Sequence, residues 1–276
     1  MKLILLTVVL FTSLFSSAQY YYKDIIGTKD ASDLITSYKN NKVRHVVVNS
    51  YDGNNNRLEN LLIQQDYLPS QQALRTTSKS ESSEQSVLNS FIDAQGRLIM
   101  TIDSSNIVVN KMVYDYTPDG LLSSLLITSI DSSKKGLESE VHLWQYKDGR
   151  VARMVRIKNR IDTTYVDFKL DENGNVIEEQ ETHHGSKSVA VLYYYDSENR
   201  LTDIVRYNPK ARRLMPEYMF EYSPANKVIQ RITVPANSSE YIIWRFQFND
   251  KGLKTKEAIY NKQKQLTGKI EYMYSF

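Results

Sequence analysis

The chain has 276 residues, with 35 Lys and Arg against 32 Asp and Glu, and a formal net charge of +3 at pH 7. Because the two signs are interspersed, the sequence shows no basic surface for nucleic acid or an anionic membrane. It contains no cysteine, which excludes disulfides and a lipid-anchoring cysteine. Twenty tyrosines, with only ten glycines and six prolines, favour strands over helices.

The first 18 residues have the pattern of a cleaved signal peptide. Lys2 supplies the positive charge, residues 3–15 form an apolar run, and Ser16-Ser17-Ala18 fits a small-residue cleavage site. The apolar run is short for a membrane span. We therefore expect an exported protein, periplasmic or secreted, with no transmembrane helix after cleavage.

Residues 19–48 do not share the pattern of the rest of the chain. Asp30 or Ser32 is a candidate N-cap for a short helix that ends near Tyr38, and residues 44–49 alternate like a strand. We expect this helix and strand to cover an end of a sheet, as terminal repeats often do. Residues 69–87, rich in Ser, Gln and Thr, are predicted to form a mobile loop.

Residues 193–201, YYYDSENRL, define a hairpin motif that recurs about every 25 residues between 49 and 276. Its Asp caps the backbone of a turn, and Gly or Asn three residues later adopts positive φ. A degenerate first copy places Asn56 at that position. The remaining predicted turn residues are Gly96, Gly120, Gly149, Gly174, Asn199, Asn226 and Gly252, with capping carboxylates at Asp93, Asp171 and Asp196.

Aromatic residues alternate with polar ones before each turn, as in strands with one buried face. The register of the motif pairs the residue before the Asp with the Leu or Val after the turn, for example Tyr195 with Leu201. The predicted aromatic ladder is Tyr114, Tyr116, Trp144, Tyr146, Phe168, Tyr193, Tyr195, Phe220, Tyr222, Phe246 and Phe248.

Eight such hairpins imply roughly fifteen or sixteen strands, more than an open twisted sheet usually carries. The sheet must also fold its apolar face onto something. We therefore predict an all-β, antiparallel hairpin meander curled into a barrel-like or spiral single-sheet shell, with a short N-terminal helix.

The units at 91–98, 168–176 and 193–201 resemble the YD repeats of the Rhs family of exported bacterial proteins. The chain is also similar to uncharacterised exported proteins of Bacteroidota. Larger Rhs proteins wind these repeats into a hollow shell that can enclose a toxic C-terminal domain. Since this chain is too short to enclose a domain, the resemblance implies the sheet architecture rather than the activity.

The sequence offers few candidates for chemistry. His183 and His184 are followed by Gly185 and Ser186, so the pair is expected in a turn between hairpins. Adjacent histidines in a strand point to opposite faces, and a metal site would need further ligands from elsewhere, so we predict no metal site there. The turn carboxylates have the spacing of caps rather than of a calcium loop. Since no nucleophile elbow, phosphate loop or zinc signature is present, we predict no catalytic residues and no cofactor.

We therefore expect a non-catalytic binding or structural module of the cell envelope, whose partner is an unknown protein or glycan, not nucleic acid. A glycan-active enzyme is one alternative. Another is an outer-membrane barrel, because Ile270, Tyr272, Tyr274 and Phe276 alternate like its last strand; the face that would meet lipid, however, carries Arg153, Glu178 and Asp203. An exposed last strand would also allow edge-strand self-association.

Overall fold

The structure, a computed structural model, describes residues 20–276 except 82, 106, 132–136 and 236–237. The predicted signal peptide, residues 1–18, lies outside the described residues. The described chain contains helix α1 (Lys23–Asn40), the short 3-10 helix η1 (Pro69–Gln71) and nineteen strands. No helix in these described ranges combines the length and the apolar composition needed to cross a membrane.

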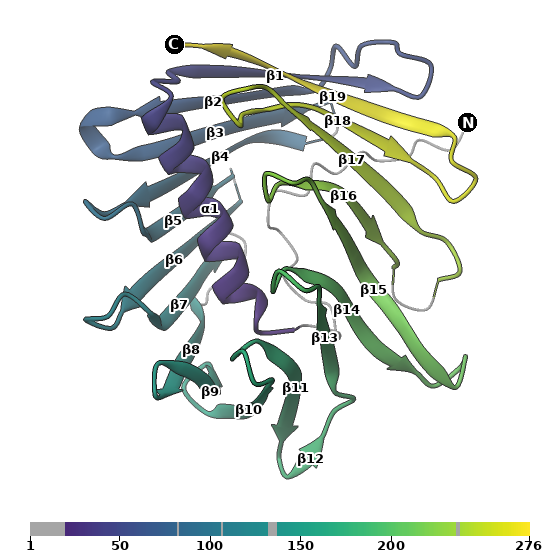
Figure 1. Ribbon diagram of the computed structural model, residues 1–276. Coiled ribbons are helices and arrows are strands. Elements are labelled where there is room, and N and C mark those ends of the chain that lie inside the picture. The colour runs from purple at the N-terminus through teal and green to yellow at the C-terminus, as the bar shows by residue number, and fades with distance from the viewer. Residues whose placement is uncertain (1–19, 82, 106, 132–136, 236–237) are drawn as a thin grey trace.

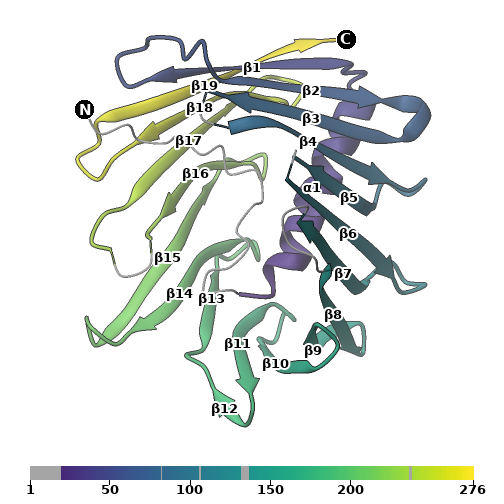
Figure 2. The same ribbon diagram turned by 180° about the vertical axis from the view of Figure 1, so that it is seen from behind.

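All strands belong to one antiparallel sheet that closes on itself (Figures 1 and 2). Successive strands pair along the chain, and β19 returns to pair with β1, so eighteen strands form a closed barrel and the two-residue β12 extends the β11–β13 connection. The all-β prediction is confirmed, and the shell closes as a barrel. The strands are β1 (His45–Asp52), β2 (Leu62–Leu68), β3 (Ala73–Ser80), β4 (Ser83–Ile92), β5 (Leu98–Ser104), β6 (Val108–Tyr116), β7 (Leu122–Asp131), β8 (Leu137–Lys147), β9 (Arg150–Lys158), β10 (Asp162–Leu170), β11 (Val176–His183), β12 (Ser186–Lys187), β13 (Val191–Tyr195), β14 (Leu201–Asn208), β15 (Arg213–Tyr222), β16 (Val228–Thr233), β17 (Ile242–Phe248), β18 (Lys254–Tyr260) and β19 (Leu266–Ser275).

The structure corrects the prediction for residues 69–87. Instead of a mobile loop, this segment holds η1, the whole of β3 and the start of β4. The polar side chains that suggested a loop alternate in and out of the wall: Thr76 is buried, whereas Arg75 is exposed and hydrogen-bonds Asn89 of β4. The predicted free edge strand is also corrected, because β19 is paired on one side with β18 and on the other with β1.

The turns follow the predicted chemistry closely. Positive φ occurs at the seven predicted Gly and Asn positions, which are Gly96, Gly120, Gly149, Gly174, Asn199, Asn226 and Gly252. In the first hairpin the left-handed residue is Asn55 (φ 65°), one residue before the predicted Asn56. The carboxylates of Asp93, Asp171 and Asp196 each accept backbone N–H groups of their own turn. The turn at Asp148-Gly149 is the tighter two-residue form, with both residues at positive φ.

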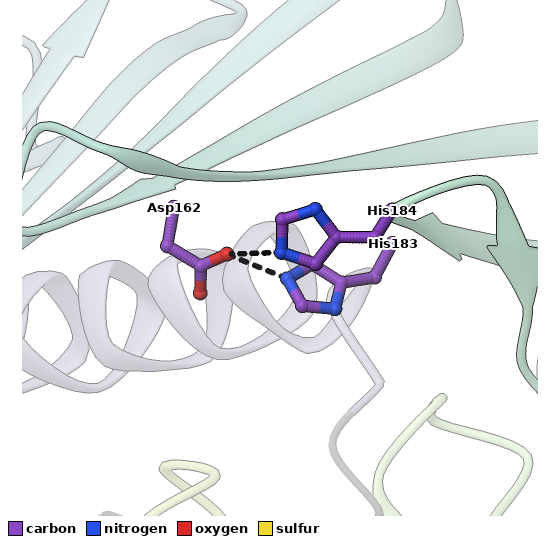
Figure 3. A group of neighbouring side chains, drawn as sticks. All are labelled: Asp162, His183 and His184. Atoms are coloured by element: carbon purple, nitrogen blue, oxygen red, sulfur yellow. Dashed lines mark hydrogen bonds and ion pairs between the residues drawn. The ribbon is translucent and has the colours of Figure 1, made fainter.

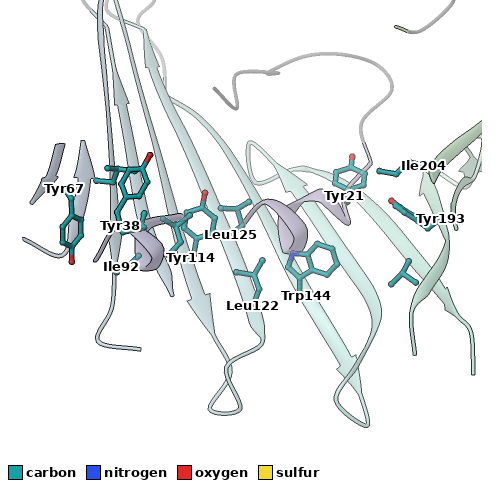
Figure 4. Close-up of a cluster of buried hydrophobic side chains, with 14 of the residues drawn as sticks. Tyr21, Tyr38, Tyr67, Ile92, Tyr114, Leu122, Leu125, Trp144, Tyr193 and Ile204 are labelled. Carbon is teal, nitrogen blue, oxygen red and sulfur yellow. The ribbon is translucent and has the colours of Figure 1, made fainter. Parts of the chain in front are cut away.

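The apolar face of the wall points inward and forms one core with α1 (Figure 4). Tyr114, Trp144, Phe168 and Tyr193 of the predicted ladder are buried there, and Tyr116, Tyr146, Tyr195 and Phe220 pack against it. Figure 1 shows α1 running diagonally across the barrel, from the region of β8 and β13 towards β1 and β2. The helix thus fills part of the space that the closed wall creates.

A hydrogen bond from the side-chain hydroxyl to a neighbouring hairpin explains why the last aromatic residue before the turn is so often Tyr. Tyr195 faces Leu201 across its own hairpin, while its hydroxyl donates to the carbonyl of Val176 in the preceding hairpin, at 2.9 Å. The same bond is made by four further tyrosines to the preceding hairpin or strand: Tyr116 to Leu98, Tyr146 to Leu122, Tyr222 to Leu201 and Tyr274 to Lys254. Each hydroxyl therefore joins one repeat to the one before it.

Candidate functional site in the barrel interior

The interior wall changes character between β8 and β11. On the rest of the inner face aromatic and aliphatic side chains dominate, but here the inward positions carry charge. His142 of β8 pairs in register with Arg156 of β9, which pairs with Thr164 of β10, which pairs with His183 of β11. Since side chains of directly paired residues share a face, these four lie in one row across the inside of the wall.

The N-terminal turn of α1 is held against this wall by a buried ion network. Nδ1 of His142 lies 2.5 Å from Oδ2 of Asp24, and its Nε2 lies 2.8 Å from Oε1 of Glu140. The other oxygen of Glu140 accepts from Nη2 of Arg156 at 2.7 Å. Both ring nitrogens of His142 face carboxylates, so the ring donates from both and carries a positive charge. The negative charges of Asp24 and Glu140 then balance the positive charges of His142 and Arg156.

The electrostatics agree with that assignment. Burial by itself would lower the pKa of His142, but the charge of Asp24 and the hydrogen bonds to Asp24 and Glu140 raise it to about 9. Burial would raise the pKa of Glu140, yet the hydrogen bonds from His142 and Arg156 lower it to about 2. At neutral pH His142 and Glu140 are therefore both charged inside the barrel.

Glu179 of β11 caps the start of α1. Its two oxygens accept the backbone N–H groups of Tyr21, at 2.7 Å, and Tyr22, at 3.0 Å, and it also accepts the hydroxyl of Tyr193 at 2.7 Å. The residues before α1 provide no side-chain cap, so this distant carboxylate satisfies the free amides at the helix N-terminus. Burial raises the pKa of Glu179, and the three hydrogen bonds oppose that rise.

This cap also corrects the predicted helix start. The helix begins at Lys23 rather than at Asp30 or Ser32. Ser32 lies inside the helix, where its hydroxyl donates to the carbonyl of Thr28 and accepts from the backbone of Leu98 in β5. The sequence pattern missed the true start because its cap comes from a strand 158 residues away in the case of Tyr21.

Sequence reasoning missed this charged wall altogether, although a signal was present. Glu140 and His142 precede Trp144 and Tyr146 at steps of two, so strand alternation places all four on the inner face. Most polar groups of the network formed by Asp24, Glu140, His142 and Arg156 are hydrogen-bonded to one another and fix α1 to the wall. Nε of Arg156 and Oγ1 of Thr164 are buried without a hydrogen-bond partner in the described part of the protein.

At the end of this row the two adjacent histidines lie on the same side, contrary to the prediction (Figure 3). His184 has φ 46° and Gly185 has φ 79°, and these left-handed residues form the turn between β11 and β12. The turn folds the His184 ring back beside that of His183, with ring centroids 4.0 Å apart. Both rings meet Asp162, the first residue of β10. Opposite-face geometry holds only for continuous extended strand, which ends here.

A recess of about 490 Å³ lies beside the end of α1. Its walls include the exposed cationic residues Lys39, Lys42 and Arg44, together with Tyr67 and Gln72. The helix ends through Lys42 at φ 58°, with the N–H of Val43 bonded to the carbonyl of Tyr38. None of the three cations has an ion-pair partner within the described residues.

The molecule is thus a closed antiparallel barrel with an internal helix anchored by buried charges. No protein-family profile matches the sequence, and no curated protein matches it. Among solved structures, the chain resembles a porin-like protein from Bacteroides uniformis, at 10% identity and a TM-score of 0.41, over 84% of this chain and 96% of that one.

Two other similar structures belong to much larger toxin chains. The crystal structure of TcdB2-TccC3-Cdc42 matches at 14% identity and a TM-score of 0.35, over 77% of this chain and 12% of that one. The Photorhabdus luminescens Tc holotoxin pore matches at 10% identity and a TM-score of 0.20, over 86% of this chain and 17% of that one. The chain spans only a small part of either toxin chain, and such low TM-scores transfer no function.

Proposed function

We propose that this protein is an exported, non-catalytic β-barrel of the cell envelope, related in architecture to YD-repeat shells, that faces water on its outside and acts as a binding or structural module. The observation that carries this proposal is the direction of polarity across the wall. The inner face holds the aromatic core and α1, whereas the outer face of β9 to β11 carries charged pairs.

The outer charges lie on the strands of the wall itself. Arg153 of β9 and Asp167 of β10 pair in register, with Nε and Oδ1 2.6 Å apart and both side chains about half exposed. Lys169 and Glu178 form a second outer pair on β10 and β11. Charged side chains on a lipid-facing wall cost about 2–4 kcal/mol each near the bilayer centre for Arg and Lys. A water-facing wall carries no such cost.

The basic recess beside α1 supports the binding role. Three exposed cations around one cavity suit an anionic group such as a carboxylate or phosphate on an envelope glycan. The charged groups of the interior wall, by contrast, are largely occupied with one another and with the helix, which supports a structural role for them. That use of the groups supports the non-catalytic part of the proposal.

Single cysteines test the proposal cleanly, because the natural chain has none. Variants Arg153→Cys and Asp203→Cys place a thiol on the outer wall, and Phe168→Cys places one in the core. A water-soluble maleimide applied to the native envelope fraction should label both outer positions and spare Phe168→Cys. Protection of both outer thiols until detergent is added would refute a water-facing wall.

An outer-membrane barrel is the second candidate, and one observation favours it. Outward apolar residues form a continuous row in which Val113 pairs with Leu126, Leu126 with Val141, and Val141 with Ile157. Such a row suits lipid on that side of the barrel. A Leu126→Cys variant distinguishes the two: labelling as fast as at Arg153→Cys supports the water-facing barrel, while protection at both positions supports the membrane barrel.

A further inference from the structure

We propose that Asp162, His183 and His184 form a binding site for a divalent transition-metal ion of the zinc type. The proposal is independent of the proposed function, and it rests on three ligand groups that the fold gathers from two strand ends. Their ligand atoms all lie within 4.8 Å of one another. Figure 3 shows the two rings and the carboxylate converging on one point.

The distances between the ligand atoms fit a metal with only small side-chain movements. Nε2 of His183 lies 2.5 Å from Oδ1 of Asp162, and Nε2 of His184 lies 3.6 Å from the same oxygen. A tetrahedral ion with bonds of about 2.0–2.1 Å separates its ligand atoms by about 3.3 Å. These two distances lie on either side of that value, and all three ligand atoms lie within 4.8 Å of one another, so small rotations of these partly exposed side chains suffice.

The ligand types select the metal. Two imidazoles and one carboxylate match zinc and its neighbours Co²⁺, Ni²⁺ and Cu²⁺, whereas Ca²⁺ and Mg²⁺ prefer sites made wholly of oxygen. The side chain of His184 is 77% exposed, which leaves the remaining coordination positions open to water. The site is therefore a three-ligand, solvent-accessible one.

The backbone holds this arrangement together. His184 occupies a left-handed conformation that non-glycine residues rarely adopt, and this conformation brings the two neighbouring histidines to one side. Asp162 is fixed by the pairing of β10 with β9. Of the nearest cations on β9, Arg156 is engaged by Glu140, while Lys158 faces Asp162 in register and weakens metal binding electrostatically.

Calorimetric titration of the untagged chain with Zn²⁺ alone tests the site. One ion should bind per chain, and His184→Ala or Asp162→Asn should weaken binding by at least about tenfold. His45→Ala is the matched control, because His45 also pairs with an aspartate, Asp66, at 2.7 Å but has no third ligand in the described structure. This control should bind zinc as the natural chain does.

Two further readouts separate loss of ligation from loss of fold. Thermal unfolding of His184→Ala without metal should match that of the natural chain, because this side chain is mostly exposed. Substituting Co²⁺ should give the strong visible absorption of tetrahedral coordination, and Lys158→Gln should bind zinc more tightly. Absence of binding in excess zinc, or unchanged binding by both ligand variants, would overturn the proposal.

Discussion

Asp24 of the helix and His142 of β8 lie 2.5 Å apart although 118 residues separate them in the chain. The pair links the N-terminal turn of α1 to the inner wall of a barrel whose closing strand, β19, is the last element of the sequence. The helix is thus part of the barrel's core and is fixed there by charge as well as by apolar packing.

The His142 network predicts a loss of stability with rising pH. The pKa of His142 is about 9 in the folded protein, raised from an ordinary value of 6.5, so the folded state binds its proton more tightly. The resulting stabilisation, on the order of 3 kcal/mol, is complete below pH 6.5 and is lost as pH rises through about 9. Denaturant unfolding across this range measures it.

The control for that experiment is His142→Gln, which cannot titrate. It should be less stable than the natural chain at neutral pH, by about 3–5 kcal/mol, since it leaves two buried carboxylates facing a neutral group. The difference in free energy of unfolding between the natural chain and His142→Gln should narrow as pH rises. A gap that stays constant would show that His142 is neutral in the folded state.

Glu179→Gln should destabilise the protein by about 1.5–3 kcal/mol, because one amide cannot accept the two backbone N–H groups and the Tyr193 hydroxyl that the carboxylate accepts. Glu178→Gln is the matched control on the same strand, where the carboxylate forms an outer pair with Lys169 and should contribute less than about 1 kcal/mol. The midpoints of urea unfolding of the two variants measure these losses of stability. Equal losses would contradict the capping role.

Two turn glycines separate backbone strain from steric contact. Gly149 has φ 73° and open space around an added Cβ, so Gly149→Ala should cost only the left-handed conformation, about 1–2 kcal/mol. Gly174 has φ 88°, and an added Cβ would lie 3.0 Å from Nε of Arg150, so Gly174→Ala should cost more. Thermal unfolding of both variants checks the order, and equal costs would show that Arg150 moves aside freely.

The tyrosine hydroxyls that join successive repeats should each contribute about 1 kcal/mol. Tyr195→Phe removes the bond to the carbonyl of Val176 without changing the ring packing. Tyr194→Phe, at the neighbouring outward and exposed position, is the control and should leave stability unchanged. Denaturant unfolding of the two variants tests this, and an equal effect from both would assign the preference for Tyr to something other than this bond.

Much of the wall was predictable because its signals are local. The Asp and the left-handed residue lie within one turn, and the pairing of Tyr195 with Leu201 follows from turn length alone. Residues 69–87 were misjudged because Ser and Thr serve equally well in loops and in strands whose inner positions are polar. The candidate metal site was missed because strand geometry was applied to a pair that lies in a turn, where the left-handed backbone of His184 sets the direction of its ring.

The sequence by itself determined the hairpins, that is, which residues turn and which face inward, since both depend on atoms a few residues apart. Only the tertiary structure decided that β19 pairs with β1, that α1 lies inside, and that Glu179 and His142 meet its first turn. These contacts join segments more than a hundred residues apart. Whether such segments meet depends on the twist and stagger that accumulate over all the strands and allow the sheet to close. A local sequence pattern does not predict that sum.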